Sequence, residues 1–141
     1  MKKVLKISFF LFIAHFQTAM SQDTKPLYEG AIPNYISGPN LQKGEVTGGM
    51  MRISNVTEPT YTFYEAKGGK SSKPCVVVCP GGGYRILAST HEGTDIAKKL
   101  NELGIHALVL YYRIPDSSRQ VDRRIAPLQD AQQAIRLVRK N

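Results

Sequence analysis

Short apolar runs, separated by glycine, proline and polar residues, give this chain its predicted strands. The runs at 75–79 and 105–111 are continuous and apolar, a pattern typical of strands that are buried on both faces. Apolar and polar residues alternate over 51–56, and 60–65 combines tyrosine, phenylalanine and threonine. Both of these segments also predict strands.

Two further segments have the period of a helix. In the first, Ser89 and Glu92 have the spacing of a capping box, and Gly104 follows as a stop signal. The second begins with Pro127, a residue favoured in the first turn of a helix. The apolar positions expected to face the sheet are Ile96, Leu100 and Leu103 in the first helix and Leu128, Ala131, Ile135 and Val138 in the second. Strand, helix, strand and helix in this order predict an α/β fold, in which helices cover both faces of a mostly parallel sheet.

The first residues have the composition of a secretory signal peptide. Lysines precede an apolar stretch at 7–16, and small residues stand before a predicted cleavage after Ser21. The stretch is too short for a permanent membrane span, so we expect a cleaved leader at 1–21 and export to the periplasm or the cell exterior. Residues 22–49 are polar and rich in turn formers, and they predict an extended arm that lies over a partial domain formed by 50–141.

Net charge and cysteine content argue against several classes of site. The 141 residues have a formal net charge of +8. No aromatic interleaving or fold signature of nucleic-acid binding accompanies this basic excess, so we expect a solvated surface and no nucleic-acid partner. On one extended strand, Cys75 and Cys79 would be about 13 Å apart, beyond the about 7 Å that a disulfide allows. The same spacing argues against a shared metal, and we expect neither a metal nor another cofactor.

The segment after the strand at 75–79 carries the candidate chemistry. Pro80 ends the apolar run, and Gly81, Gly82 and Gly83 let the backbone adopt positive φ angles close to a ligand. Such a turn aims several backbone N–H groups at one point, as an anion or oxyanion site requires. The third glycine of a dinucleotide fingerprint is missing, and no lysine-bearing phosphate loop occurs. A purely structural turn is the alternative, although one glycine would suffice for it.

Several ordered segments of the chain match the motifs of one known family. They are residues 27–33, 55–60, 79–84, 91–93, 112–113 and 127–132. These segments resemble secreted α/β-hydrolase esterases of the kind grouped with xylan and carbohydrate acetylesterases. The resemblance implies the N-terminal half of an α/β-hydrolase fold, with an oxyanion hole formed by the N–H groups of Gly82 and Gly83 and, as further candidates, Gly81 and Tyr84. Tyr84 would also line the substrate pocket, with plain packing as the alternative.

Members of this family carry a nucleophilic serine in a Gly-x-Ser-x-Gly elbow, followed by an aspartate and a histidine. No Gly-x-Ser-x-Gly occurs in the 141 residues, so the triad is absent and the fold is expected to stop before the nucleophile-elbow strand. The strand at 75–79 would then form an open sheet edge through which chains self-associate. The expected function is the N-terminal part of an exported serine carboxylesterase acting on acylated carbohydrates. A non-catalytic carbohydrate-binding or interaction module is the alternative.

The remaining candidate side chains have structural interpretations. His91 is predicted in the first turn of a helix and His106 within an apolar strand, so capping or packing explains them better than catalysis. Ser89 fits an N-cap and lacks a glycine elbow. Arg113 and Asp130 carry opposite charges where strand and helix elements meet, and we expect them to form a structural ion pair.

Overall fold

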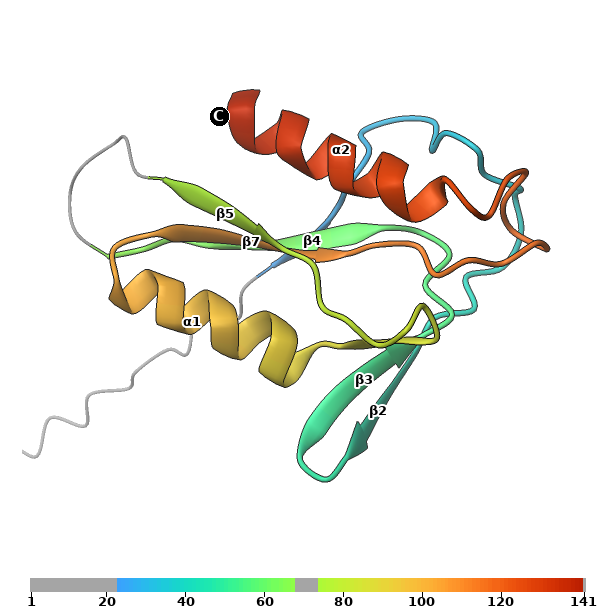
Figure 1. Ribbon diagram of the computed structural model, residues 1–141. Coiled ribbons are helices and arrows are strands. Elements are labelled where there is room, and N and C mark those ends of the chain that lie inside the picture. Colours follow the sequence, from blue (N-terminus) through green and yellow to red (C-terminus); the bar gives the residue numbers. More distant parts are fainter. Residues whose placement is uncertain (1–22, 68–73, 141) are drawn as a thin grey trace, which may run out of the picture.

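The computed structural model describes residues 23–67 and 74–140 (Figure 1). Their strands form two sheets, and the two α-helices described lie on opposite faces of the larger sheet. The predicted signal peptide at 1–21 lies outside the described residues and stays a prediction. Within the described residues, no helix is long and apolar enough to cross a membrane.

The larger sheet has the strand order β1-β4-β7-β5. These strands are β1 (Thr24–Pro26), β4 (Thr60–Tyr64), β5 (Cys75–Val78) and β7 (His106–Tyr111). β5 runs parallel to β7, whereas β4 is antiparallel to β7 and β1 is antiparallel to β4. The prediction of a mostly parallel sheet is therefore wrong for the described strands. Parallel pairing requires a crossover that returns the chain to the same end of the sheet, and only β5 and β7 are joined by such a helix.

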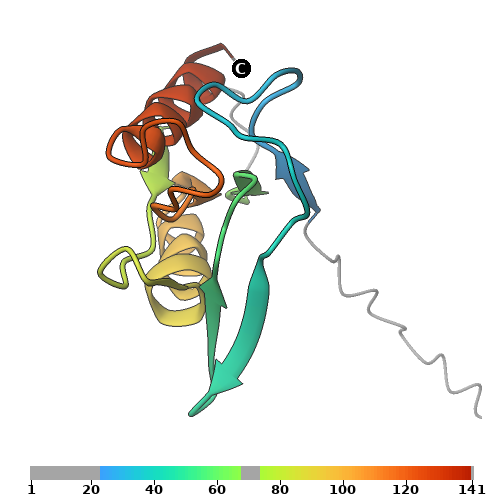
Figure 2. The same ribbon diagram turned by 90° about the vertical axis from the view of Figure 1, so that its right-hand side faces the viewer.

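A smaller antiparallel sheet contains β2 (Lys43–Thr47), β3 (Met50–Ser54) and β6 (Ile86–Ala88) in that order. β2 and β3 form a hairpin that projects away from the larger sheet and its helices (Figure 2). β1 and β2 both belong to the predicted arm at 22–49, so the arm contributes one strand to each sheet. The division into arm and domain at residue 50 stays a prediction.

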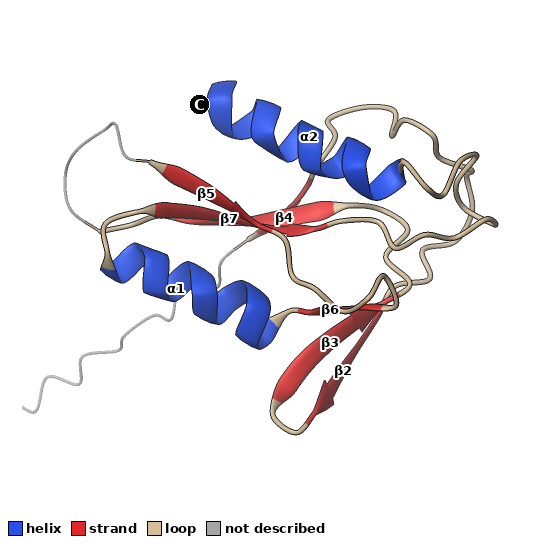
Figure 3. Ribbon diagram, viewed as in Figure 1, coloured by secondary structure: helices blue, strands red, loops and turns tan. Residues whose placement is uncertain are grey.

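The two helices, α1 (Asp95–Glu102) and α2 (Ala126–Lys140), cover the two faces of β7 (Figure 3). Alternate β7 residues enter different cores, since side chains alternate along a strand. On the α1 side the core includes Ala97, Ala107, Val109 and Tyr111. On the α2 side it includes Leu27, Leu108, Leu110 and Ala134. The prediction that this apolar strand is buried on both faces is confirmed.

The predicted helix stripes are confirmed in part: Leu100 of α1 and Ala131 and Val138 of α2 pack against the core. In α1, Ala97 is fully buried, whereas Ile96 and Leu103 are exposed. In α2, Leu128 and Ile135 are exposed, and the buried residues are Ala126, Asp130 and Ala134. Small side chains and one paired carboxylate face the sheet, which lets each helix approach it closely. Ile96, Leu103, Leu128 and Ile135 are left on the flanks of the helices.

A turn of π-helix, η1 (Thr90–Thr94), directly precedes α1. Ser89, at its N-cap, has helical backbone angles and makes no side-chain capping hydrogen bond. The Glu92 carboxylate accepts a hydrogen bond from the N–H of Gly81 instead. The predicted capping box is therefore wrong, and Glu92 connects the start of the helix to the glycine loop.

Candidate functional site

The glycine loop connects β5 to β6 and has positive φ at three consecutive residues. The φ angle is 143° at Gly82, 61° at Gly83 and 57° at Tyr84. The carbonyl groups of Gly81 and Gly82 accept hydrogen bonds of 2.9–3.4 Å from the backbone N–H groups of Arg85, Ile86 and Ala88. The loop is thus closed onto β6 through its carbonyl groups.

The N–H groups of the loop are used differently. The N–H of Gly81 donates to the Glu92 carboxylate over 2.8 Å, so it is already engaged. The N–H groups of Gly82, Gly83 and Tyr84 have no hydrogen-bond partner among the described residues, and all three residues are exposed. A cluster of consecutive free donors is the arrangement that stabilises a negatively charged oxygen.

Two glycines of the loop have a steric explanation, and the third has a conformational one. A Cβ atom at Gly81 would lie 2.6 Å from Glu92 Oε2, and one at Gly82 would collide with the backbone carbonyl of Ile86. Gly83 has open space around it, and its left-handed backbone favours glycine without strictly requiring it. Backbone geometry therefore accounts for the run of three glycines. The support for an anion site comes from the free N–H groups and not from the number of glycines.

We expect Gly82→Ala to destabilise the protein more than Gly83→Ala. The first substitution forces the backbone around Ile86 to shift, whereas the second adds only the left-handed penalty of about 1–2 kcal/mol. Urea denaturation of the two variants measures the difference. Equal losses of stability would contradict the close approach of Gly82 to β6.

A cavity of about 270 Å³ opens beside the loop. It is lined by Cys79, Tyr84, Tyr112, Arg124, Pro127, Leu128 and Ala131. The Tyr84 ring is 59% exposed and meets Tyr112 edge to face, with 6.2 Å between the ring centroids. Tyr84 therefore both packs on a neighbouring ring and lines a cavity, so the two roles considered for it are compatible.

Tyr112 supports the loop from the end of β7. Its hydroxyl donates a hydrogen bond of 2.7 Å to the carbonyl oxygen of Pro80. Burial, together with the nearby Tyr84 hydroxyl, raises the pKa of Tyr112 to about 12. The phenol therefore stays protonated, and remains a donor, far above neutral pH.

The histidines and Ser89 make structural contacts. His106 Nδ1 accepts a hydrogen bond of 3.0 Å from the N–H of Ala66, and its ring centroid lies 5.4 Å from that of Phe63. His91 is half exposed, with Nε2 3.5 Å from Glu92 Oε1. Ser89 is buried, and its hydroxyl lies 3.5 Å from the Tyr111 hydroxyl. These contacts agree with structural roles for the three residues.

Arg113 and Asp130 form the predicted ion pair, and both side chains are 0% exposed. Arg113 Nη2 lies 2.8 Å from Asp130 Oδ1, and Arg113 Nε donates to Asp130 Oδ2 over 2.9 Å. The Tyr28 hydroxyl also donates to Asp130, and Arg113 Nη1 donates to the carbonyl oxygen of Pro33. The pair therefore fixes α2 and the arm against the end of β7.

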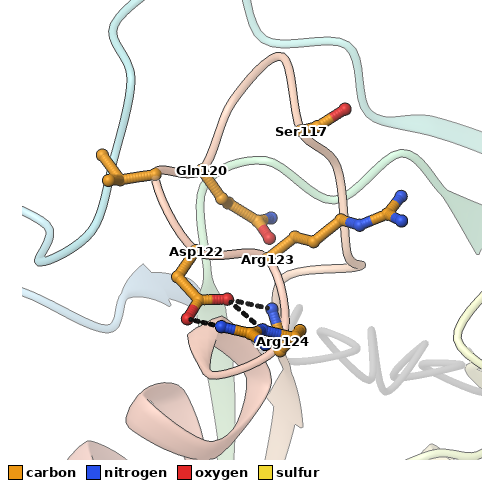
Figure 4. A pocket seen from close by; sticks show the side chains of 6 residues that line it. Ser117, Gln120, Asp122, Arg123 and Arg124 are labelled. Atoms are coloured by element: carbon orange, nitrogen blue, oxygen red, sulfur yellow. Dashed lines mark hydrogen bonds and ion pairs between the residues drawn. The ribbon is translucent and has the colours of Figure 1, made fainter.

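A second cavity, of about 380 Å³, lies in the loop before α2 (Figure 4). It is lined by Ser117, Gln120, Val121, Asp122, Arg123 and Arg124. Hydrogen bonds from Arg124 lower the pKa of Asp122, and the Gln120 amide bonds to the N–H of Asp116 and the carbonyl oxygen of Ile114. The side chains of Gln120, Asp122 and Arg124 are engaged within the protein in this way, and we assign no ligand to this cavity. Arg124 lines both cavities and thus lies between them.

Cys75 and Cys79 are free thiols, and burial raises the pKa of both. A raised pKa lowers the thiolate fraction, so Cys79, which lines the first cavity, is poorly suited to act as a nucleophile.

In the part of the chain that the structure describes, no group of three or more His, Cys, Asp or Glu side chains is placed to hold a metal ion.

Three known proteins are similar to this chain. The acetylxylan esterase of Xylanibacter ruminicola is 32% identical over 99 residues, which cover 63% of this chain and 20% of that protein. Endo-1,4-beta-xylanase B of Butyrivibrio fibrisolvens is 39% identical over 69 residues, covering 49% of this chain and 11% of that protein. An acetyl ester-xyloside bifunctional hydrolase from Caldicellulosiruptor lactoaceticus is similar in structure, with a TM-score of 0.61 and 32% identity over 84% of this chain and 36% of that chain. No family model matches the chain.

The chain is thus similar, in sequence and in fold, to esterases of the α/β-hydrolase type, and the resemblance predicted from its motifs is confirmed. It spans 11–36% of the length of these three proteins.

The oxyanion role of Gly82 and Gly83 stays a prediction. The sequence analysis did not predict that Glu92 and Tyr112 contact the glycine loop. Both residues lie within the motifs at 91–93 and 112–113 that match the family, and this position could have indicated a role near the loop.

Proposed function

We propose that this chain is the N-terminal part of an exported serine carboxylesterase that acts on esters of carbohydrates, and that it contributes the oxyanion loop. The observation that carries the proposal is the set of free N–H groups at Gly82, Gly83 and Tyr84 beside the cavity of about 270 Å³. Similarity to an acetylxylan esterase and to an acetyl ester-xyloside hydrolase supports an acylated carbohydrate as the substrate.

In the proposed reaction, a serine oxygen attacks the ester carbonyl and forms a tetrahedral intermediate whose negative charge lies on the former carbonyl oxygen. The N–H groups of Gly82 and Gly83 donate to this oxyanion, and one such donor typically contributes about 10²–10³-fold to the rate. Tyr84 and Tyr112 provide an aromatic wall for the bound ester. Because no Gly-x-Ser-x-Gly occurs in the 141 residues, the proposal takes the serine, aspartate and histidine from polypeptide outside this chain.

We also propose that the protein is exported to the periplasm or the cell exterior. The support is the basic start followed by the apolar stretch at 7–16, with cleavage predicted after Ser21. Polymeric carbohydrate esters are met outside the cytoplasm, so this location agrees with the proposed substrate.

The chain by itself is expected not to hydrolyse small aryl acetates above the rate in buffer. Oxyanion donors without a nucleophile provide no covalent route, so serine-directed phosphonate probes are also expected to leave the protein unlabelled. A spectrophotometric assay and mass spectrometry of the probe-treated protein check both results. Robust turnover that disappears in Ser89→Ala would overturn the proposal and assign Ser89 as the nucleophile.

The alternative function is a non-catalytic carbohydrate-binding or interaction module, and the missing serine elbow favours it. The coding DNA beyond the codon for Asn141 distinguishes the two. A frame that continues, directly or after one frameshift, into Gly-x-Ser-x-Gly supports the esterase. A frame without it, together with calorimetric binding of acetylated xylo-oligosaccharides to the chain alone, supports the module.

We further propose that the open edge of β5 mediates self-association. Among the described strands β5 has β7 as its one neighbour, and it carries no charged residue. Val76 is 39% exposed on this strand. Leu128 lines the cavity beside the glycine loop, and Ile135 is exposed about two turns further along the same side of α2. An unpaired edge flanked by apolar side chains favours pairing with another chain.

A further inference from the structure

One peptide group of the glycine loop is held at both ends by side chains. Its carbonyl oxygen, on Pro80, accepts a hydrogen bond of 2.7 Å from the Tyr112 hydroxyl. Its N–H, on Gly81, donates to Glu92 Oε2 over 2.8 Å. The C=O and N–H of a trans peptide point in opposite directions. The two side chains therefore contact this group from opposite sides and fix its rotation about the chain axis.

Both side chains are anchored on elements outside the loop. Tyr112 directly follows β7. Glu92 belongs to η1, and this turn packs tightly on Pro80, because a Cβ at Gly93 would lie 3.2 Å from both Pro80 Cγ and Val109 Cγ1. Pro80 is itself fully buried. The peptide group is thus tied to β7 and to η1, and it cannot turn without moving one of them.

Attraction of an anionic substrate does not explain the position of Glu92. A carboxylate this close to the loop repels a negatively charged oxygen. Glu92 also provides no cap for the helix that it begins, and its other polar contact is His91, with 3.5 Å between Oε1 and Nε2. Its remaining contact is the hydrogen bond that it accepts from the Gly81 N–H. Glu92 therefore contributes by holding the loop in one conformation.

Each following residue adds its own φ and ψ, so one fixed peptide group orients the next ones only if the loop is also held further along. The hydrogen bonds from the N–H groups of Arg85, Ile86 and Ala88 to the carbonyl groups of Gly81 and Gly82 hold it there. We propose that Glu92 and Tyr112 are positioning residues: they orient the peptide between Pro80 and Gly81 so that the N–H groups of residues 82–84 stay free for an anionic oxygen. This inference rests on the proposed oxyanion function.

The test compares Glu92→Leu, Glu92→Gln and Tyr112→Phe with the unchanged chain. Leucine removes the acceptor, whereas glutamine keeps a carbonyl oxygen that can accept from Gly81. Glu102→Leu is the matched control, because it removes an exposed carboxylate of α1 whose ion-pair partner is Lys99. Urea denaturation checks that each variant is folded, and hydrogen exchange is followed at the amide of Gly81.

In Glu92→Leu, exchange at Gly81 is expected to accelerate about tenfold, the factor that corresponds to loss of one hydrogen bond. Glu92→Gln is expected to restore most of the protection, and Glu102→Leu to leave it unchanged. Tyr112→Phe is expected to move the amide NMR shifts of residues 82–84 while the protein stays folded. Unchanged exchange in Glu92→Leu, a glutamine variant as fast as the leucine variant, or unmoved shifts in Tyr112→Phe would each overturn the positioning role.

Titration with sodium acetate, a small carboxylate, tests the site that is being positioned. Acetate is expected to shift the amide signals of residues 82–84 in the unchanged chain, and at least as tightly in Glu92→Gln, which loses the repulsion but keeps the acceptor. Glu92→Leu loses the same repulsion and also the acceptor, so its Kd for acetate is expected to be at least about tenfold higher than that of Glu92→Gln. Absence of any acetate-dependent shift in the unchanged chain would contradict the proposed oxyanion function. The exchange result at Gly81 would still decide separately whether the two side chains orient the loop.

Discussion

Asp130→Ala is expected to lower the stability of the protein by about 3–5 kcal/mol, because it leaves a buried guanidinium without its counter-charge. Arg113 and Asp130 are both 0% exposed, and Asp130 also accepts hydrogen bonds from the N–H of Arg113 and from the Tyr28 hydroxyl. Native domains are stable by only about 5–15 kcal/mol. The variant should therefore unfold at a much lower urea concentration, as measured by circular dichroism.

Two further variants distinguish the loss of the buried ion pair from the loss of a charge at any position. Asp122→Asn removes a carboxylate from the exposed pair with Arg124, and it is expected to change the urea midpoint little, since exposed pairs contribute little. The double variant Arg113→Met with Asp130→Leu removes both charges, and it is expected to be more stable than Asp130→Ala alone. If Asp130→Ala and Asp122→Asn lowered the midpoint equally, the structural role of the buried pair would be refuted.

Val76→Lys is expected to convert a self-associating chain into a monomer at micromolar concentration. A lysine in the middle of β5 places a charge on the open edge, and charged side chains prevent edge-to-edge pairing of strands. Val76 is 39% exposed, so the longer side chain reaches solvent without disturbing the core. Size-exclusion chromatography with light scattering measures the change in mass.

Val46→Lys is the matched control, because β2 is the edge strand of the smaller sheet and Val46 is 63% exposed. This variant is expected to associate like the unchanged chain. A monomer produced by Val46→Lys but not by Val76→Lys would assign association to the hairpin. A sharp monomer peak for the unchanged chain, with protected amides along β5, would contradict an open edge altogether.

The strands could be predicted from the sequence far better than their pairing. Residues 75–79 and 105–111 were expected as strands, and they correspond to β5 and β7. An apolar composition can be recognised in each strand by itself, and β7 is buried as this composition predicts, whereas Val76 of β5 is 39% exposed. The direction of β4 relative to β7 depends on residues far apart in the chain, and no local pattern encodes it. The short β1 was missed because a strand of two polar residues and a proline is formed by pairing with β4 and not by its composition.

The candidate site was predictable to the extent that backbone conformation depends on glycine. The turn at 81–83 was expected, and positive φ is found at Gly82 and Gly83. The hydrogen bond between Glu92 and Gly81 was not predicted, because the spacing of Glu92 from Ser89 fits a helix cap as well as a contact with a distant loop. Only the packing of η1 on Pro80 brings its carboxylate to Gly81. The helical stripes were predicted only in part. Leu100, Ala131 and Val138 pack against the core, but the small Ala97 is buried where Ile96 was expected.

The hydrogen bonds around Asp130 also bear on the order in which the chain folds. The Tyr28–Asp130 contact joins residues 102 positions apart, and the Arg113–Pro33 contact joins residues 80 positions apart. Closing loops of this length costs chain entropy before any contact compensates it. During synthesis residues 22–49 emerge before α2, so the Tyr28 hydroxyl has no Asp130 carboxylate to donate to until α2 has left the ribosome. The contacts of Tyr28 and Pro33 with Asp130 and Arg113 are therefore expected to form late, after the more local pairing of β1 with β4 and of β2 with β3.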